Sequence, residues 1–195
     1  MALNCVVEGR PDEAVVRRLA NEAGLPLGRV HVKNGRTQIK LNLNGYDNAA
    51  RFGPWLVLVD LDRDECAPAL HRLWLPDPKP LMLFRIAVRT IESWLLADRE
   101  TIAEFLSIDS SLVPLNPEAE PSPKRTLVDL ARRSRNPKIR RDLVPRPGSG
   151  RAEGLLYPYR IAEYVELLWD PEAAAQRSDS LRRCRERLRE LVPPA

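Results

Sequence analysis

The chain has 195 residues, of which 44% are hydrophobic and 30% charged, a composition typical of a globular protein rather than a disordered one. No apolar run approaches the roughly 20 residues that a membrane-spanning helix needs, so we expect no membrane association. The net charge of +4 is unevenly divided, with −3 on residues 1–123 and +7 on residues 124–195, which indicates a polyanionic partner such as nucleic acid.

Strands and helices are expected to alternate along residues 1–54. Residues 3–8 form a short apolar run that ends in Glu8, and a helix with an apolar stripe is expected to begin at Pro11 and end at Gly24. Residues 29–33 alternate in the manner of a strand. Residues 36–52 are ambiguous, because part of them alternates as a strand would, whereas a helix over about 37–51 fits a βαβ order better.

Residues 55–60, Trp-Leu-Val-Leu-Val-Asp, are the clearest strand in the sequence. Their continuous apolar character is typical of a central parallel strand buried on both faces. A helix near residues 66–75, a strand at 81–86 and helices at 89–97 and 100–106 follow. This order predicts an α/β fold with a small Rossmann-like parallel sheet.

The second part of the chain predicts mostly helices. A Pro- and Ser-rich loop over 109–123 precedes a basic helix at 124–135, an irregular segment at 136–151 and helices at 157–168 and 180–191. We therefore expect an α/β core over residues 1–108 and a basic helical C-terminal extension over 109–195 that packs on it. Residues 124–146 hold nine basic and two acidic residues, which form either a phosphate-binding surface or a solvated face. The last helix has an apolar stripe and is expected to pack.

Acidic residues follow two of the predicted strands. Glu8 ends the first strand, Asp60 ends the central strand, and Asp62 and Asp64 lie in the turn after it. The carboxyl ends of parallel strands meet at one edge of a sheet, so these four carboxylates are expected to converge. Their mutual repulsion would raise their pKa values unless a cation neutralised them, and such hard oxygen ligands suit Mg²⁺ or Mn²⁺. The alternatives are a solvated acidic turn and a Glu8 that caps the next helix.

This pattern resembles the Toprim superfamily, the catalytic fold of topoisomerases, bacterial primases and OLD-type nucleases. The matching residues are Val-Val-Glu8-Gly9 and Val-Leu-Val-Asp60-Leu-Asp62-Arg-Asp64. The resemblance implies that Asp60 and Asp62 hold the metal, that Asp64 assists, and that Glu8 is the general acid/base or a ligand of a second metal.

A further stretch, Phe84-Arg-Ile-Ala-Val-Arg-Thr-Ile-Glu-Ser-Trp-Leu-Leu-Ala-Asp98, is similar to the signature of a bacterial Toprim-like family of unknown function. Pro117-Glu118 and Pro123-Lys124 also resemble that family. Through the likeness to OLD-type nucleases, Lys124 is expected to support the metal site. Glu92 either reaches the metal as a further ligand or pairs with Arg85 or Arg89 in a structural contact.

Three functions are compatible with these residues. The resemblance implies a Mg²⁺- or Mn²⁺-dependent nuclease that acts on DNA more than RNA, beside an ATPase partner in bacterial defence or repair. A haloacid-dehalogenase-type phosphatase also begins with Asp-x-Asp after an apolar strand, and a non-catalytic Toprim-like scaffold could retain the same acids. Widely spaced cysteines and an N-terminus without a signal-like pattern lead us to expect a cytoplasmic protein.

Overall fold

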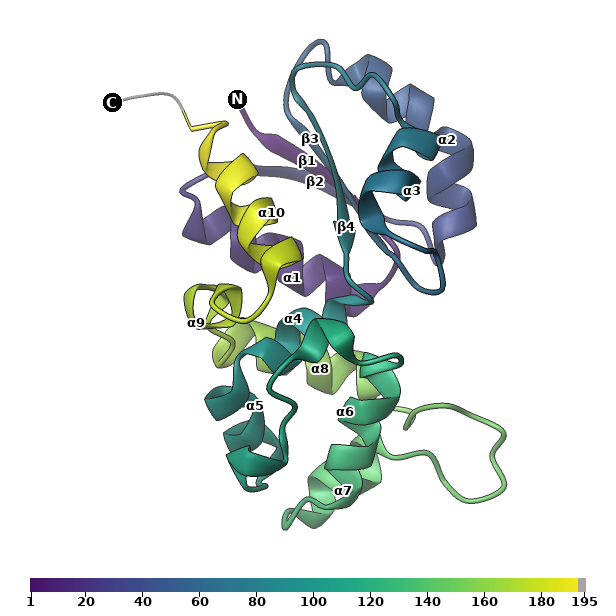
Figure 1. Ribbon diagram of the computed structural model, residues 1–195, viewed down its shortest axis with the longest axis vertical. Coiled ribbons are helices and arrows are strands. Elements are labelled where there is room, and N and C mark those ends of the chain that lie inside the picture. The colour runs from purple at the N-terminus through teal and green to yellow at the C-terminus, as the bar shows by residue number, and fades with distance from the viewer. Residues whose placement is uncertain (193–195) are drawn as a thin grey trace.

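A four-stranded parallel sheet forms one half of the molecule, with its strands in the order β2-β1-β3-β4 (Figure 1). The computed structural model describes residues 1–192. The strands are β1 (Leu3–Val7), β2 (Leu27–Val32), β3 (Trp55–Asp60) and β4 (Met82–Ala87). The predicted α/β class with a parallel sheet and a helical C-terminal part is therefore confirmed.

Helices cover both faces of this sheet. On one face lie α2 (Arg36–Ala49) and α3 (Ala67–Trp74), and on the other lie α1 (Arg10–Glu22) and α10 (Asp179–Arg189) (Figure 1). Because both faces are covered, the interior strands β1 and β3 carry mostly apolar side chains on both sides.

The central strand β3 shows this two-sided burial directly. Leu56 and Leu58 belong to the hydrophobic cluster on the α1 face, and Val57 and Val59 belong to the cluster on the α2 face. Successive side chains of a strand point to opposite faces, so every position from 56 to 59 is buried and the run carries no polar residue before Asp60.

The ambiguous segment at residues 36–52 is helical. Ile39 and Leu43, one helical turn apart, are buried against the sheet, whereas Leu41 is 73% exposed. A strand would have placed all three side chains on one face, so the alternation seen in the sequence is incidental.

The other half of the molecule is helical, and the positions of its elements differ in part from those predicted. The elements are α4 (Ile91–Ala97), α5 (Arg99–Leu106), α6 (Pro123–Arg132), α7 (Pro137–Leu143), α8 (Tyr157–Leu167) and α9 (Pro171–Ala175), with 3₁₀ turns at Ser110–Leu112 and Pro117–Ala119. The expected irregular segment at 136–151 is wrong over α7. Its Pro137 occupies the first helical turn, where a missing N–H is harmless, and Asn136 caps the helix by accepting the N–H of Lys138.

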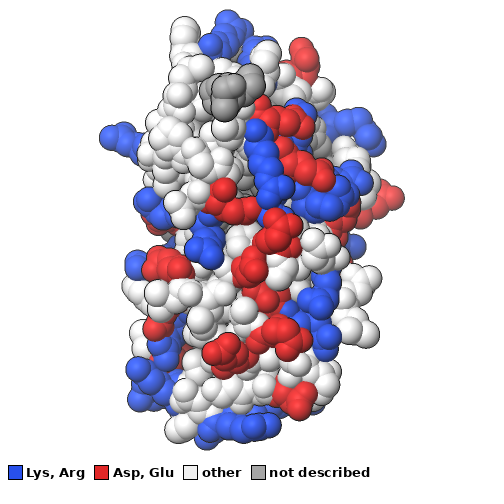
Figure 2. Space-filling model, turned by 90° about the vertical axis from the view of Figure 1, so that its left-hand side faces the viewer, with Lys and Arg blue, Asp and Glu red and all other residues white. Residues whose placement is uncertain are grey.

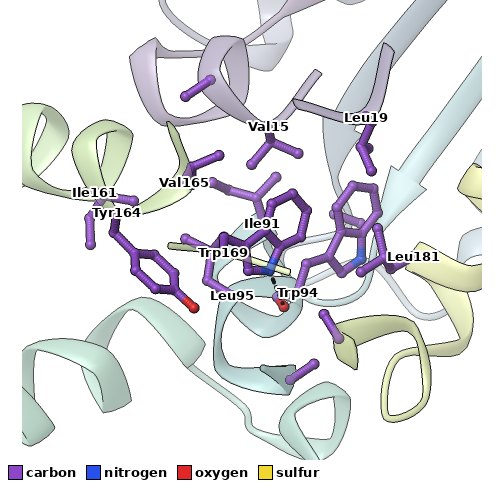
Figure 3. Packing of buried hydrophobic residues seen from close by; sticks show 14 of the residues in the cluster. Val15, Leu19, Ile91, Trp94, Leu95, Ile161, Tyr164, Val165, Trp169 and Leu181 are labelled. Atoms are coloured by element: carbon purple, nitrogen blue, oxygen red, sulfur yellow. Dashed lines mark hydrogen bonds between the residues drawn. The ribbon is translucent and has the colours of Figure 1, made fainter. Parts of the chain in front are cut away.

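One hydrophobic cluster joins the two halves, and α4 lies inside it. All seven residues of α4 are buried. Figure 3 shows Trp94 of α4 beside Trp169, with Val15 and Leu19 of α1 close by, and the Trp169 Nε1–H donates to the Trp94 carbonyl at 3.3 Å. The Trp94 Nε1–H donates to Ser180 Oγ at 2.7 Å. This packing fixes the start of α4, which contributes to the candidate site.

Candidate active site

A pocket of about 440 Å³ opens beyond the carboxyl ends of β1 and β3, and we call it the acidic pocket. Its lining carries more acidic than basic side chains: the acidic residues are Glu8, Asp12, Asp60, Glu92 and Glu153, and the basic ones are Arg10 and Lys124. Glu8 immediately follows β1 and Asp60 is the last residue of β3. The structure therefore brings together Glu8, Asp60, Glu92 and Lys124 of the predicted site.

Backbone hydrogen bonds fix Glu8 and Asp60 relative to each other. Glu8 Oε1 accepts the backbone N–H of Asp60 at 3.0 Å, which ties the end of β1 to the end of β3. Asp60 Oδ1 accepts the N–H of Ile91, the first residue of α4, also at 3.0 Å. One carboxylate oxygen of each residue is thus engaged by the protein framework, and this positions both groups before any ligand arrives.

Asp12 completes the pocket and was missed as a site residue by the sequence reasoning. It lies in the first turn of α1, is 6% exposed, and its Oδ1 has no hydrogen-bond partner within residues 1–192. The available sequence signal was its closeness to Glu8, four residues earlier, across the tight strand-to-helix junction. A buried carboxylate oxygen without a partner is costly, so this atom marks a position where a cation or a proton would be favourable.

Burial and mutual repulsion raise the pKa values of three of these carboxyl groups. Burial, together with the charge of Glu92, raises the pKa of Asp12 to about 7. Burial, with the charges of Asp12, Glu92 and Glu8 added, raises the pKa of Asp60 well above its ordinary value. Burial also raises the pKa of Glu8, although the Asp60 N–H partly offsets this effect. Simultaneous ionisation of these three carboxyl groups is therefore unfavourable.

Glu92 and Lys124 form a connected pair at the side of the pocket. Glu92 is 1% exposed and accepts hydrogen bonds from Thr90 Oγ1 at 2.7 Å and from the Tyr157 hydroxyl at 3.1 Å. Lys124 Nζ lies 3.5 Å from Glu92 Oε1. Burial lowers the pKa of Lys124, but the neighbouring carboxylates outweigh it and raise that pKa overall, so the ammonium is retained. The hydrogen bonds and ion pair of Glu92 within the described residues are to Thr90, Tyr157 and Lys124, not to Arg85 or Arg89.

Asp62 and Asp64 line a neighbouring pocket rather than the acidic pocket. Arg36 Nη1 lies 3.2 Å from Asp62 Oδ2, and Arg36 Nη2 lies 2.6 Å from Asp64 Oδ2. Arg89 Nη1 donates to the backbone carbonyls of Asp62 and Asp64 at 3.3 and 2.8 Å. The charge of Asp62 still raises the pKa values of Glu8 and Asp60, so the two pockets are within electrostatic reach.

The donor chemistry of the acidic pocket suits a hard divalent cation. Its carboxylate oxygens are the ligands that Mg²⁺ prefers, and Asp12 Oδ1 is an unpartnered one. Among the described residues, no three His, Cys, Asp or Glu side chains already form a ligand set. Mg²⁺ commonly takes one or two protein carboxylates and completes its shell with water and substrate phosphate, so the pocket fits an ion bound in that manner.

The arginines of the last helix, α10, are all engaged in ion pairs with acidic residues. On α10, Leu181, Cys184 and Leu188 are buried, and Arg185 bridges Glu22 of α1 and Glu172 of α9, so this helix packs as predicted. Figure 2 shows basic and acidic side chains intermingled on the side of the molecule that carries α9 and α10. This side does not present a surface of one charge sign to a polyanion.

Comparisons with models of known protein families, with curated proteins and with solved structures find no match to this chain. Among the described residues, no helix is long and apolar enough to cross a membrane.

Proposed function

We propose that this chain is a Mg²⁺- or Mn²⁺-dependent enzyme that processes phosphodiester bonds in nucleic acid, DNA more than RNA. The observation that supports this most is Asp12, a buried carboxylate with an unpartnered oxygen, beside Glu8 and Asp60. The raised pKa values of these three carboxyl groups mean that their ionised forms are disfavoured in the pocket. A divalent cation would offset that cost.

The roles follow from which oxygens the fold has already engaged. Asp60 and Asp12 would hold the cation, because Asp60 uses only Oδ1 in its bond to Ile91 and Asp12 Oδ1 is unpartnered. When bound, the cation would stabilise negative charge on the phosphodiester oxygens. The raised pKa of Glu8 makes its carboxylate a stronger base, which suits a group that takes a proton from the attacking water and passes it to the departing sugar oxygen.

Lys124 and Glu92 have supporting roles in this proposal. The Lys124 ammonium lies at the pocket and would contact a phosphate oxygen. Glu92 holds Lys124 in place and is itself held by Thr90 and Tyr157. An ATPase partner, which the resemblance to defence and repair nucleases implies, remains part of the proposal.

The test is cleavage of labelled DNA and RNA, single- and double-stranded, with Mg²⁺ or Mn²⁺ and with a chelator control. Wild type is compared with Asp60→Asn and with the exposed-surface control Arg72→Gln. We expect metal-dependent cleavage that Asp60→Asn abolishes and Arg72→Gln preserves. Absence of cleavage with either metal, alone and with an adjacent ATPase gene product, would refute the proposal. Turnover of a phosphomonoester instead would favour a phosphatase.

A further inference from the structure

A second pocket, of about 450 Å³, adjoins the acidic pocket, and Lys124 lines both. We call it the basic pocket because its charged lining consists of Arg36, Arg63, Arg89 and Lys124 with only two acids, Asp62 and Asp64. Thr90 and the segment 121–123 complete the wall. The four cationic side chains come from four separate segments of the chain, so the fold gathers them.

The two acids of the basic pocket are already paired within it. Both pair with the single guanidinium of Arg36, which also lies over the Trp74 ring with its central carbon 4.9 Å from the ring centroid. Four cationic side chains against two acids leave the lining of this pocket with a net positive charge. A positively charged cavity next to an acidic one is an arrangement that would receive an anion alongside a cation.

Hydrogen-bond donors in the basic pocket remain available. Arg89 uses only Nη1, for the two backbone carbonyls, so its Nε and Nη2 donors have no partner within residues 1–192. Arg63 is exposed and makes no hydrogen bond or ion pair with the described residues. The start of α6 also lines the pocket, through Ser122, Pro123 and Lys124, and the Ser122 side chain does not cap this helix.

We propose that the basic pocket binds a phosphate group of the substrate strand, next to the phosphodiester that the acidic pocket receives. The planar guanidinium groups of Arg89 and of the exposed Arg63 match phosphate oxygens in geometry and charge. Lys124, at the boundary, would lie between the two phosphates. The inference rests on the proposed function, since it assigns the substrate strand a second anchoring point.

The test measures binding of a fluorescein-labelled single-stranded oligonucleotide by fluorescence anisotropy, over a series of salt concentrations. Chelator is present so that no turnover occurs. Arg63→Gln removes a pocket cation that supports no other described contact, Arg63→Lys keeps the charge, and Arg72→Gln removes an equally exposed arginine outside the pocket. We expect Arg63→Gln to weaken binding roughly three- to tenfold and to reduce the slope of log affinity against log salt concentration by about 0.7, the value for one phosphate contact on a single strand. Arg63→Lys should recover part of the loss, and Arg72→Gln should match wild type.

Inorganic phosphate and a nucleoside monophosphate are run as competitors, to separate a strand phosphate from a small phosphate ligand. Weak competition, at millimolar concentrations only, is expected for a strand subsite. Tight binding of either small molecule without oligonucleotide binding would overturn the inference, as would an Arg63→Gln variant with wild-type affinity and salt slope.

Cleavage is measured separately, so the two proposals fail in different ways. Cleavage that Asp60→Asn abolishes, with oligonucleotide binding indifferent to Arg63, would retain the enzyme and reject the subsite. Binding that depends on Arg63, with no cleavage under any metal, would retain the subsite and reject the enzyme.

Discussion

The acidic and basic pockets receive carboxylates from the same Asp60-Leu-Asp62-Arg-Asp64 run, yet these carboxylates have opposite surroundings. Asp60 faces other buried carboxyl groups, and its pKa is raised. Asp62 and Asp64 both form ion pairs with Arg36. The difference teaches that the residues opposite an acidic motif, rather than the motif itself, decide whether each acid is available to a cation or serves as a structural counter-ion.

The largest expected effect separates the two pockets by activity. Asp60→Asn should lower metal-dependent cleavage by at least about 100-fold, because it removes charge at the position proposed for the cation. Asp64→Asn should lower it by less than about tenfold, because Asp64 acts through Arg36 and the turn. Initial cleavage rates at saturating metal measure both.

Equal losses in the two variants would show that the acids of both pockets serve the metal. Circular dichroism of each variant confirms that it is folded, so that a lost activity is not a lost structure.

The next effect concerns pH. Burial raises the pKa of Asp12 to about 7, above the ordinary value of 3.8, so the folded state holds this proton more tightly than the unfolded chain does. Its contribution to stability is therefore complete below about pH 4 and declines as pH rises toward about 7. In chelator, the melting temperature should fall through this range, and millimolar Mg²⁺ should raise it at about pH 7.5 by roughly 4–8 °C.

Thermal unfolding of wild type and Asp12→Asn, with chelator and with Mg²⁺, checks this expectation. The variant should show a shallower decline with pH and a smaller gain from Mg²⁺. A wild-type melting temperature unaffected by Mg²⁺ at about pH 7.5 would speak against a cation in the acidic pocket.

A smaller effect with opposite signs tests the contrast between the two pockets most directly. Near neutral pH in chelator, Asp12→Asn should raise the melting temperature by roughly 2–4 °C, because it removes a buried charge with an unpartnered oxygen. Asp64→Asn should lower it by roughly 1–3 °C, since a partly exposed ion pair contributes at most about 1 kcal/mol. Shifts of the same sign in both variants would contradict the assignment of a paired and an unpaired acid.

The smallest effect probes the wall of the acidic pocket. Gly9 has an extended backbone that any residue can adopt, but a Cβ there would lie 3.2 Å from Asp12 Oδ2. Gly9→Ala should therefore displace the Asp12 carboxylate slightly. The apparent affinity for Mg²⁺, measured from thermal stabilisation, should fall about two- to fivefold, and the melting temperature without Mg²⁺ should change little. The control is Gly53→Ala, where an added Cβ meets no atom within 4 Å.

Most of the fold could be predicted from the sequence, because the patterns that indicate strands and helices extend over only a few residues. The unbroken apolar run of β3 and the amphipathic stripe of α1 identify a buried strand and a helix that covers it. The errors also have local causes. α7 falls in the segment predicted as irregular, because prolines there indicate loops, although Pro137 is compatible with the first turn of a helix.

Only those site residues that lie at strand ends could be predicted from the residues themselves. Glu8 and Asp60 could be placed together from the sequence because carboxyl ends of parallel strands share one edge, and the structure places them so. Glu92 and Lys124 came from a resemblance, and the structure places both at the same pocket. Asp12 was not predicted as a site residue, since burial and a missing hydrogen-bond partner have no sequence signature.

By itself, the sequence determined the parallel sheet, the covering helices and the two strand-end acids, because these depend on hydrophobic periodicity over a few residues. Only the tertiary structure decided how the acids divide between two pockets. Arg36 meets Asp62 and Asp64 from about 26 residues earlier in the chain, and Tyr157 meets Glu92 from 65 residues later. Such partners are set by the packing of whole elements, and that packing determines which carboxylates are left for a cation.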